Sequence, residues 1–179
     1  MRQRLIFGSV MGIALAAILV GGQLAAQGNG ASRVRADMNG LQEDPSVSTT
    51  GHGSFTAKID DEAQVIEYEL SYSDLEGGAS LFSHIHFGSH DHNGGVSAFL
   101  CGGSTKPAPC PYPSGTVTGT IVPADVVGPN GQGIEPGAWT ELVRAIRAGH
   151  TYANLHTTRW TGGEIRGQIR NNDQRETTR

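Results

Sequence analysis

Three histidines carry the spacing of a metal site. His84 and His86 are two residues apart in SHIHFG, and His156 follows seventy residues later in YANLHT. Successive side chains of a β-strand point to opposite faces, so His84 and His86 share one face while Ile85 lies on the other. The same alternation turns Leu155 towards the core and His156 away from it. If the two strands are neighbours, three imidazoles converge on one outer surface of the protein.

Three imidazoles are a suitable ligand set for a transition metal. Neutral imidazole nitrogens bind copper, zinc, nickel and iron, and a set without carboxylate or thiolate favours Cu(II) on affinity. The sequence therefore predicts a copper site with one position open to water or substrate. Zinc held by three histidines and a water is the close alternative, and that ligand set supports hydrolysis. The remaining alternative is that these histidines are ordinary exposed polar residues.

Polar neighbours of the histidines are candidates for supporting roles. In GGEIRGQI, Glu164 and Arg166 alternate with isoleucines, so we expect them to project outward from the strand that follows His156. Glu164 is placed to accept an imidazole N–H, and Arg166 is the candidate catalytic residue that would attract an anion such as superoxide. Alternatively, both fix the hairpin through a surface ion pair or hydrogen bond. Asn154 and Tyr152 flank the third histidine on the same outer face.

Further histidines lie in the loop directly after the first strand. His90 and His92 enclose an aspartate in SHDHNGG, where a flexible backbone can bring ligands back over the strand end. They are expected either to complete the three-histidine site, to form a second one, or to remain solvated. His52 and His150 have no partner at metal-ligand spacing and are expected to be structural or exposed.

Short candidate strands recur along the chain between clusters of Gly, Pro, Asn and Asp. They are residues 33–39, 52–59, 64–72, 80–87, 95–100, 114–122, 151–157 and 164–170. This spacing predicts an antiparallel sandwich or barrel. One segment departs from the β pattern, because PGAWTELVRAIRAGH carries Trp139, Leu142, Val143 and Ile146 at helical spacing and stops at Gly149. We therefore expect one short amphipathic helix crossing the sandwich, with the tryptophan as its core anchor.

The ends of the chain indicate export. Arg2 and Arg4 precede an apolar run and small residues near position 26, the order of a secretory signal peptide, although an uncleaved anchor is the alternative. Residues 27–32 are then a flexible leader, 33–170 one domain and 171–179 a disordered tail. In an oxidising compartment, Cys101 and Cys110 in LCGGSTKPAPCP are expected to form a local disulfide rather than bind metal. These features predict a secreted or periplasmic protein with no membrane span after cleavage.

The charge balance restricts the partners. Loss of residues 1–26 removes two of the 13 basic residues and none of the 17 acidic ones, which changes the formal charge from −4 to −6. Nucleic acid and anionic membranes are therefore disfavoured as partners. A small anion such as superoxide, or an extracytoplasmic protein, is compatible with this charge, and so is a homodimer.

Several segments together resemble the CHRD domain, the module named from chordin and common in secreted bacterial proteins. They are MNGLQEDPSVSTTGHGSF, HIHFGSHDHNGGV, LCGG with PCP, SGTVTGTIVPADV and AGHTYANLHTTRWTGGEIRGQI, in order from Met38 to Ile169. The resemblance implies an all-β, antiparallel Greek-key or immunoglobulin-like β-sandwich outside the cytoplasm, and it implies no settled activity. The chain departs from the family pattern at His90 and His92 and at Asp44-Pro45, where a double proline is usual.

The H-x-H strand with a distant third histidine is also similar to the copper site of copper/zinc superoxide dismutases. This similarity is local and is an analogy rather than a family match. We therefore expect an exported copper-binding protein, with superoxide dismutation as the activity such a site would support. The competing hypothesis is a non-catalytic module that binds a protein or the cell envelope, with a structural metal or none. Zinc-dependent hydrolysis is a third hypothesis.

Overall fold

The computed structural model describes residues 33–171. The predicted signal peptide (1–26), the leader (27–32) and residues 172–179 of the predicted tail lie outside the described residues, whereas Asn171 ends the last strand. All eight predicted strands are present, with bounds within one residue of those expected. The elements are β1 Arg33–Asn39, η1 Gly40–Gln42, β2 His52–Asp60, β3 Val65–Ser73, β4 Ser80–Phe87, β5 Gly95–Cys101, β6 Gly115–Ile121, η2 Pro123–Asp125, η3 Asn130–Gln132, α1 Trp139–Arg147, β7 Thr151–Thr157 and β8 Ile165–Asn171.

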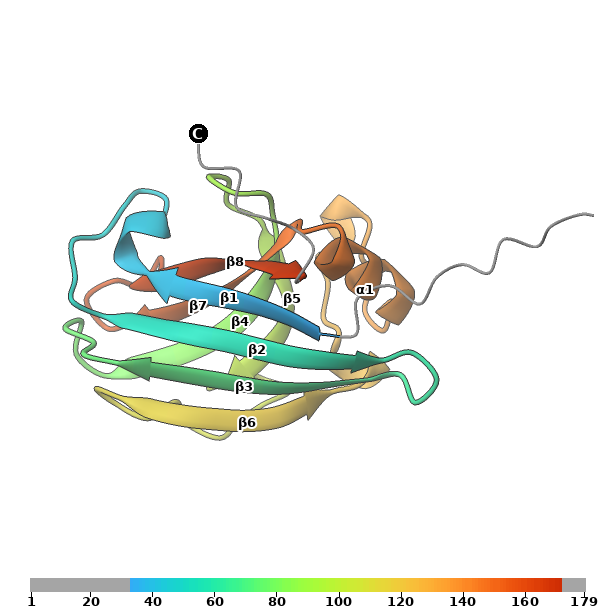
Figure 1. Ribbon diagram of the computed structural model, residues 1–179, viewed down its shortest axis with the longest axis horizontal. Coiled ribbons are helices and arrows are strands. Elements are labelled where there is room, and N and C mark those ends of the chain that lie inside the picture. The colour runs from blue at the N-terminus through green and yellow to red at the C-terminus, as the bar shows by residue number, and fades with distance from the viewer. Residues whose placement is uncertain (1–32, 172–179) are drawn as a thin grey trace, which may run out of the picture.

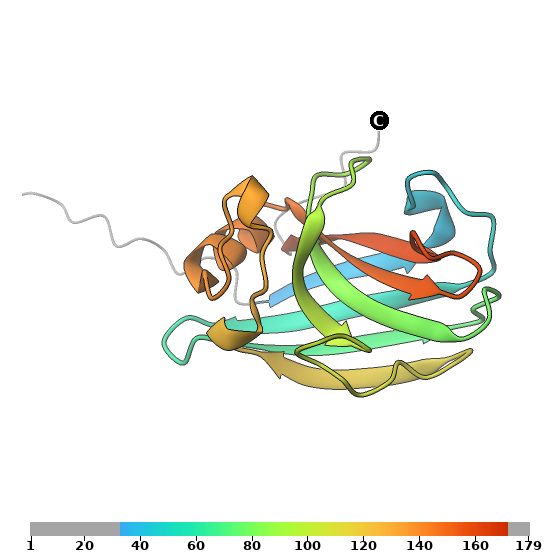
Figure 2. The same cartoon turned by 180° about the vertical axis from the view of Figure 1, so that it is seen from behind.

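The strands form one antiparallel sheet in the order β5-β4-β7-β8-β1-β2-β3-β6. The sheet curls until its two edge strands, β5 and β6, come into contact, so that it is nearly closed into a barrel (Figures 1 and 2). The all-β antiparallel fold is confirmed, and of the two architectures predicted from the strand spacing the sheet is nearer to the barrel; the division into two packed sheets that the family resemblance implies is not found within residues 33–171. The sheet does not divide because β1 pairs with β2 on one side and with β8 on the other. The hydrogen-bonded ladder therefore continues where a sandwich would have a gap.

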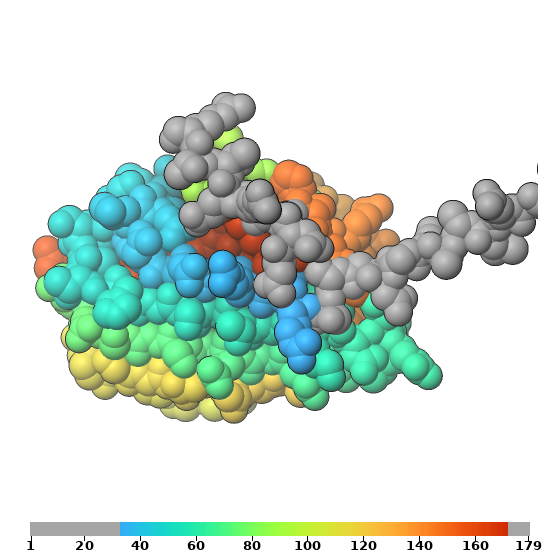
Figure 3. Space-filling view, in the orientation of Figure 1, coloured from blue at the N-terminus to red at the C-terminus, as the bar shows by residue number. Residues whose placement is uncertain are grey.

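Two halves of the sheet share the interior but differ in their outer faces. We call β1, β2, β3 and β6 the open half and β4, β5, β7 and β8 the covered half. In the open half more exposed residues alternate with less exposed ones, as in β1, and these strands form much of the surface seen in Figure 3. In the covered half both faces are buried along most of β7 and β8.

The interior is a single apolar core to which both halves contribute. Phe55 and Leu70 from the open half and Ile85, Leu155 and Ile165 from the covered half are each at most 1% exposed. Burial of such side chains stabilises the fold by about 1.5–3 kcal/mol each. The inward assignments made from alternation are thus confirmed, and they leave the histidines of β4 and β7 on the opposite side of the sheet from this core.

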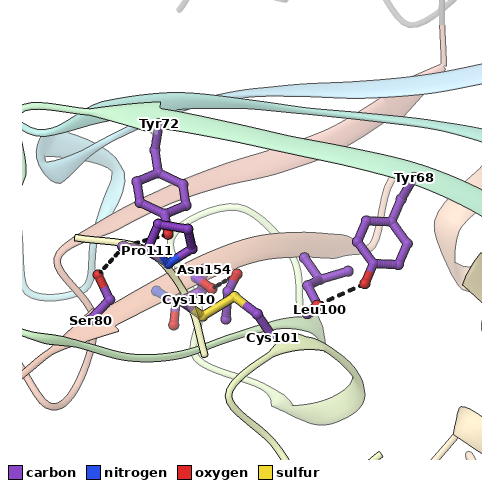
Figure 4. The surroundings of a disulfide bond; sticks show 9 residues. Tyr68, Tyr72, Ser80, Leu100, Cys101, Cys110, Pro111 and Asn154 are labelled. Carbon is purple, nitrogen blue, oxygen red and sulfur yellow. Dashed lines mark hydrogen bonds between the residues drawn. A yellow bond between two sulfur atoms is a disulfide. The ribbon is translucent and has the colours of Figure 1, made fainter. Parts of the chain in front are cut away.

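Side chains hold the two edges of the sheet together at the seam. The hydroxyl of Tyr68 on β3 donates to the carbonyl of Leu100 on β5 at 2.7 Å, and that of Tyr72 donates to the carbonyl of Pro111 at 2.7 Å (Figure 4). The predicted Cys101–Cys110 disulfide is present and ties the end of β5 to the segment that leads to β6. The seam therefore closes through tyrosine hydrogen bonds and a covalent bond.

The predicted helix is confirmed as α1, with Trp139, Leu142, Val143 and Ile146 buried. It lies at one end of the barrel rather than crossing it (Figures 1 and 2). Gly149, with a φ of 74°, lies just beyond its end in the left-handed region that suits glycine. Within residues 33–171, no helix has the length and apolar character needed to span a membrane.

Candidate metal centre

Neighbouring strands bring the three predicted histidines to one face. β4 and β7 pair directly, with Phe82 opposite His156 and His84 opposite Asn154. Because alternate residues share a face, His86 joins them on the same side of the sheet. The condition set by the sequence pattern, adjacency of the two strands, is therefore met.

The three imidazoles form a tight cluster. The ring centroid of His84 lies 4.4 Å from that of His86 and 4.6 Å from that of His156, and the other two rings are 6.3 Å apart. One nitrogen from each ring lies within 4.8 Å of the other two. These separations bring the nitrogens around one common point, as a metal bound at about 2.0–2.1 Å from each nitrogen requires.

The cluster is buried, so the expectation of a surface site is wrong. His84, His86 and His156 are 3%, 9% and 6% exposed. Loops cover this face of the sheet: Gly94 of the loop after β4 accepts from His86 Nδ1, and Thr161 of the loop after β7 accepts from His156 Nδ1, both at 2.8 Å. Alternation placed the histidines opposite the apolar core correctly, but it carries no information about what covers that face.

Hydrogen bonds leave one nitrogen of each ring without a partner. Since the carbonyls of Gly94 and Thr161 are acceptors, His86 and His156 carry their protons on Nδ1 and present bare Nε2 atoms. Both Nε2 atoms, together with Nδ1 of His84, are buried and have no hydrogen-bond partner. A backbone carbonyl on the far nitrogen is the usual support of a metal-binding histidine, because it fixes the tautomer and ring orientation.

Burial also keeps the rings uncharged. Desolvation, reinforced by the two neighbouring imidazoles, lowers the pKa of His84 to about 2. Desolvation lowers the pKa of His86 to about 4, against the opposing effect of the Gly94 hydrogen bond, and it lowers the pKa of His156 as well. At neutral pH the cluster is therefore three neutral imidazoles, the protonation state that binds metal.

With this geometry established, comparison with known families matches residues 34–169 to the CHRD domain. The chain belongs to the CHRD domain family. A search of curated proteins found no match, so the similarity to copper/zinc superoxide dismutases is confined to the histidine spacing. The match begins in β1, ends in β8 and includes all three clustered histidines.

Tyr152 and Arg166 form a stack against the cluster. The Tyr152 ring lies parallel to that of His86, with centroids 4.6 Å apart, and the Arg166 guanidinium lies 3.5 Å from the other side of the tyrosine ring. Arg166 is 2% exposed and donates to the carbonyls of Ser89 and His92. Arg166 does project outward from β8 as predicted, but it is buried beneath the loop after β4, which it fastens to the sheet.

Glu164 is likewise buried rather than exposed, at 0%. Its carboxylate accepts from the Thr49 hydroxyl at 2.8 Å and from the backbone N–H groups of Glu76 and Gly77 at 2.7 and 3.1 Å. Glu164 was expected to accept an imidazole N–H, but the Nδ1–H group of the nearest histidine in the chain, His156, donates to the Thr161 carbonyl instead. Glu164 thus organises the two loops before β2 and β4 at one edge of the covered half.

Asn154 and Glu43 form a buried polar pair beside the cluster. Asn154 Nδ2 donates to Glu43 Oε1 at 2.6 Å, and the two residues are 2% and 7% exposed. Burial raises the pKa of Glu43 to about 8, although the nearby Arg166 cation opposes this shift. Asn154 was singled out from the sequence, but Glu43 was not. It stands in the LQEDP segment after β1, where only the family resemblance gave a signal.

The remaining histidines stay outside the cluster. His90 pairs with the adjacent Asp91 at 2.7 Å, and His92 Nδ1 lies 3.0 Å from the His90 carbonyl, all in an exposed part of the loop. His52 contacts Ser73 on the open half, and His150 lies 2.9 Å from the Ser89 hydroxyl. Among the described residues, the cluster of potential metal ligands consists of His84, His86 and His156 alone.

Proposed function

We propose that this CHRD domain protein binds one transition-metal ion through His84, His86 and His156. Two observations carry the proposal: one ring nitrogen of each histidine lies within 4.8 Å of the other two, and each ring has a buried nitrogen without a hydrogen-bond partner. An unsatisfied buried polar atom costs about 1–3 kcal/mol, so three in contact are unfavourable unless a ligand satisfies them. A metal ion accepts all three lone pairs at once and matches the neutral state of the rings.

Copper is the first choice of metal and zinc the second. The donor set consists of imidazoles, and the nearby cysteines are joined in a disulfide and offer no thiolate. Copper binds such a nitrogen set more tightly than the other divalent metals of the first transition row, while zinc is common in three-histidine sites that keep one further position. The fixed Nδ1 hydrogen bonds of His86 and His156 support either metal.

The site favours metal binding rather than chemistry on a diffusing anion. Arg166, the cation expected to attract superoxide, uses its guanidinium on loop carbonyls and on the ring of Tyr152. Superoxide dismutation and zinc-dependent hydrolysis are therefore left out of the proposal, and an extracytoplasmic protein partner remains a prediction.

An extracytoplasmic location is part of the proposal. The disulfide at the seam is typical of proteins that fold in an oxidising compartment, and the N-terminal sequence predicts export.

The test is a metal titration of the protein after treatment with a chelator. We expect one Cu(II) per chain by calorimetry and an electron paramagnetic resonance (EPR) signal with nitrogen hyperfine splitting. His84→Ala and His156→Ala are each expected to lower the affinity by at least about 100-fold, beyond the 10–100-fold typical of outer-shell changes. His52→Ala, which removes an exposed histidine, is the matched control. Absence of uptake of both copper and zinc, or equal affinity in the His156 variant, would overturn the proposal.

A further inference from the structure

The carboxamide of Asn154 is held in a defined orientation beside the cluster. Its Nδ2 donates to Glu43 Oε1 at 2.6 Å, so Oδ1 is the end of the amide that faces away from Glu43. The other end, Oδ1, is buried and has no hydrogen-bond partner. An acceptor left bare in the interior costs about 1–3 kcal/mol, so this oxygen needs a partner of its own.

The position of Asn154 in the sheet makes the metal site the candidate partner for its unpaired Oδ1 atom. Asn154 lies on β7 between Tyr152 and His156 on the same face, and directly opposite His84 on β4. Its side chain also lies close enough to His86 to act on the pKa of that imidazole. Asn154 is therefore adjacent to all three histidines, at the centre of the face that they occupy.

Close packing holds the pair in this arrangement. Gly163, in the loop after β7, has a φ of 136°, and a Cβ there would lie 2.5 Å from both Asn154 Nδ2 and Glu43 Oε1. A side chain at this position would displace one or both groups, so the loop reaches the pair only because residue 163 is glycine. The amide is thus enclosed by the histidine face on one side and by Glu43 and the loop backbone on the other.

We propose that Asn154 Oδ1 is the oxygen donor of the metal site, acting either directly on the metal or on a water bound to it, and that Glu43 is the positioning residue that holds this oxygen in place. The inference rests on the proposed metal binding by the three histidines. Three imidazoles leave one position of a four-coordinate metal to fill, and a neutral carboxamide oxygen is a suitable donor or acceptor there. Four buried atoms that lack partners, three nitrogens and one oxygen, are then satisfied by one ion.

The experiment uses Cu(II) as the probe and EPR as the readout. Asn154→Leu keeps the approximate size of the side chain and removes the oxygen. We expect the nitrogen hyperfine pattern of the three histidines to persist while the g and copper hyperfine values shift and the affinity falls by about 10–100-fold. A spectrum superimposable on that of the wild type would overturn the inference.

Two Glu43 variants test the positioning role. Glu43→Gln keeps an oxygen acceptor for the Asn154 amide and should retain a wild-type copper spectrum, whereas Glu43→Leu releases the amide and should shift the spectrum as Asn154→Leu does. This second variant also gives the test if Asn154→Leu does not fold. A wild-type spectrum in Glu43→Leu would contradict the role assigned to Glu43.

Further measurements show how Asn154 contacts the metal and distinguish failure of this inference from failure of the proposed function. Broadening of the wild-type spectrum in water enriched in oxygen-17 identifies a metal-bound water as the link, and its absence identifies direct coordination by Asn154; both agree with the inference. If copper binding is equal in wild type and His156→Ala, the proposed function itself fails. If binding depends on His156 but the spectrum is insensitive to Asn154, only the present inference fails.

Discussion

The open and covered halves of the sheet follow the same alternation and reach opposite results. In β3 the outward residues Glu67 and Glu69 are exposed, whereas in β7 the outward Asn154 and His156 are 2% and 6% exposed. The difference arises from the loops after β1, β4 and β7, which fold over one half only. Polar outward residues on the open half are hydrated, while those on the covered half must find partners within the protein.

This contrast shows how a strand pattern typical of a surface can form an interior site. A polar side chain beneath a loop is costly unless it is bonded, so each one on the covered half has a specific task. Arg166 and Gln168 hold the loop after β4, Glu164 orders two loops, and the histidines present free nitrogens. The covered half has in effect a second, polar core on the far side of the sheet from the apolar one.

Acid should affect the covered half most strongly. For the metal-free protein, the lowered pKa values of His84, His86 and His156 mean that their contribution to stability is present above pH 6.5 and is lost as the pH falls. The raised pKa of Glu43 acts in the opposite direction, since its contribution is lost as the pH rises from 4.5 to about 8. Three groups outweigh one, and each proton costs about 1.4 kcal/mol per pH unit. We therefore expect the free energy of unfolding to decrease steeply from pH 6.5 to 5.

Urea unfolding at several pH values measures this effect, and hydrogen exchange locates it. Amides of β4 and β7 should lose protection before those of β2 and β3. Equal loss of protection in the two halves would remove the distinction drawn between them.

Arginines on the two halves offer the next test. Arg166→Ala removes donors from two loop carbonyls and the contact with Tyr152, and should cost about 3 kcal/mol. Arg35→Ala, on the neighbouring β1 but exposed, should change the free energy of unfolding by about 0.5 kcal/mol at most. Chemical denaturation of both variants compares the two halves directly. A similar loss in the free energy of unfolding for both would show that a buried arginine on the covered half stabilises the fold no more than an exposed one.

A glycine pair in the loop after β7 gives a finer comparison. Gly163→Ala should cost about 2 kcal/mol, because of the positive φ and the contacts with Asn154 and Glu43, and should weaken metal binding. Gly162→Ala is the matched control, since a Cβ there meets nothing within 4 Å. Calorimetric Tm values and copper titrations of the two variants measure the difference. A fully stable Gly163 variant would show that the loop is free to withdraw from the pair.

The smallest effect is expected for the exposed ion pair between Asp61 and Arg147. Arg147 lowers the pKa of the Asp61 carboxyl, so the contribution of the pair is present above pH 3.8 and is lost as the pH falls further. Asp61 is about half exposed, and solvent screening limits the value of such pairs to about 0.2–1 kcal/mol. Asp61→Asn should therefore change Tm only slightly, as thermal unfolding at neutral pH will show. A loss comparable to that of Arg166→Ala would contradict the contrast between exposed and covered charges.

The sequence was sufficient for local features of this fold. Alternation located eight strands, helical spacing located α1, and the H-x-H pair with His156 identified the cluster, because each of these follows from residues close together in the chain. The strand spacing left a sandwich and a barrel open, and it could not decide between them, since the continuous sheet depends on pairing between the first and last strands. The burial of His84 was not foreseen, since the loops that cover a face leave no periodic signal in the strand beneath them.

The same limit explains the errors about individual residues. Glu164 and Arg166 were correctly placed on the outward face of β8, yet their partners come from loops about 75 to 115 residues earlier. Glu43 was missed because a lone carboxylate in a turn has no pattern that links it to Asn154, 111 positions away. Sequence reasoning thus identified which residues share a face, and the tertiary fold determined which of them share a hydrogen bond.

The pairing of β1 with β8 sets an order of events for the chain. Val34 at the beginning of the domain pairs with Asn171 at its end, and β8 also completes the covered half by pairing with β7. In a chain synthesised from its N-terminus, β1 and β2 are therefore present long before β8, the partner of β1. Such long-range pairing is slow compared with hairpin formation. The histidine cluster likewise waits for a late strand, because His84 and His86 on β4 must pair with β7, the last strand before β8, to meet His156. Metal capture is accordingly a property of the finished domain, and a truncated or still emerging chain would carry His84 and His86 without the means to retain an ion.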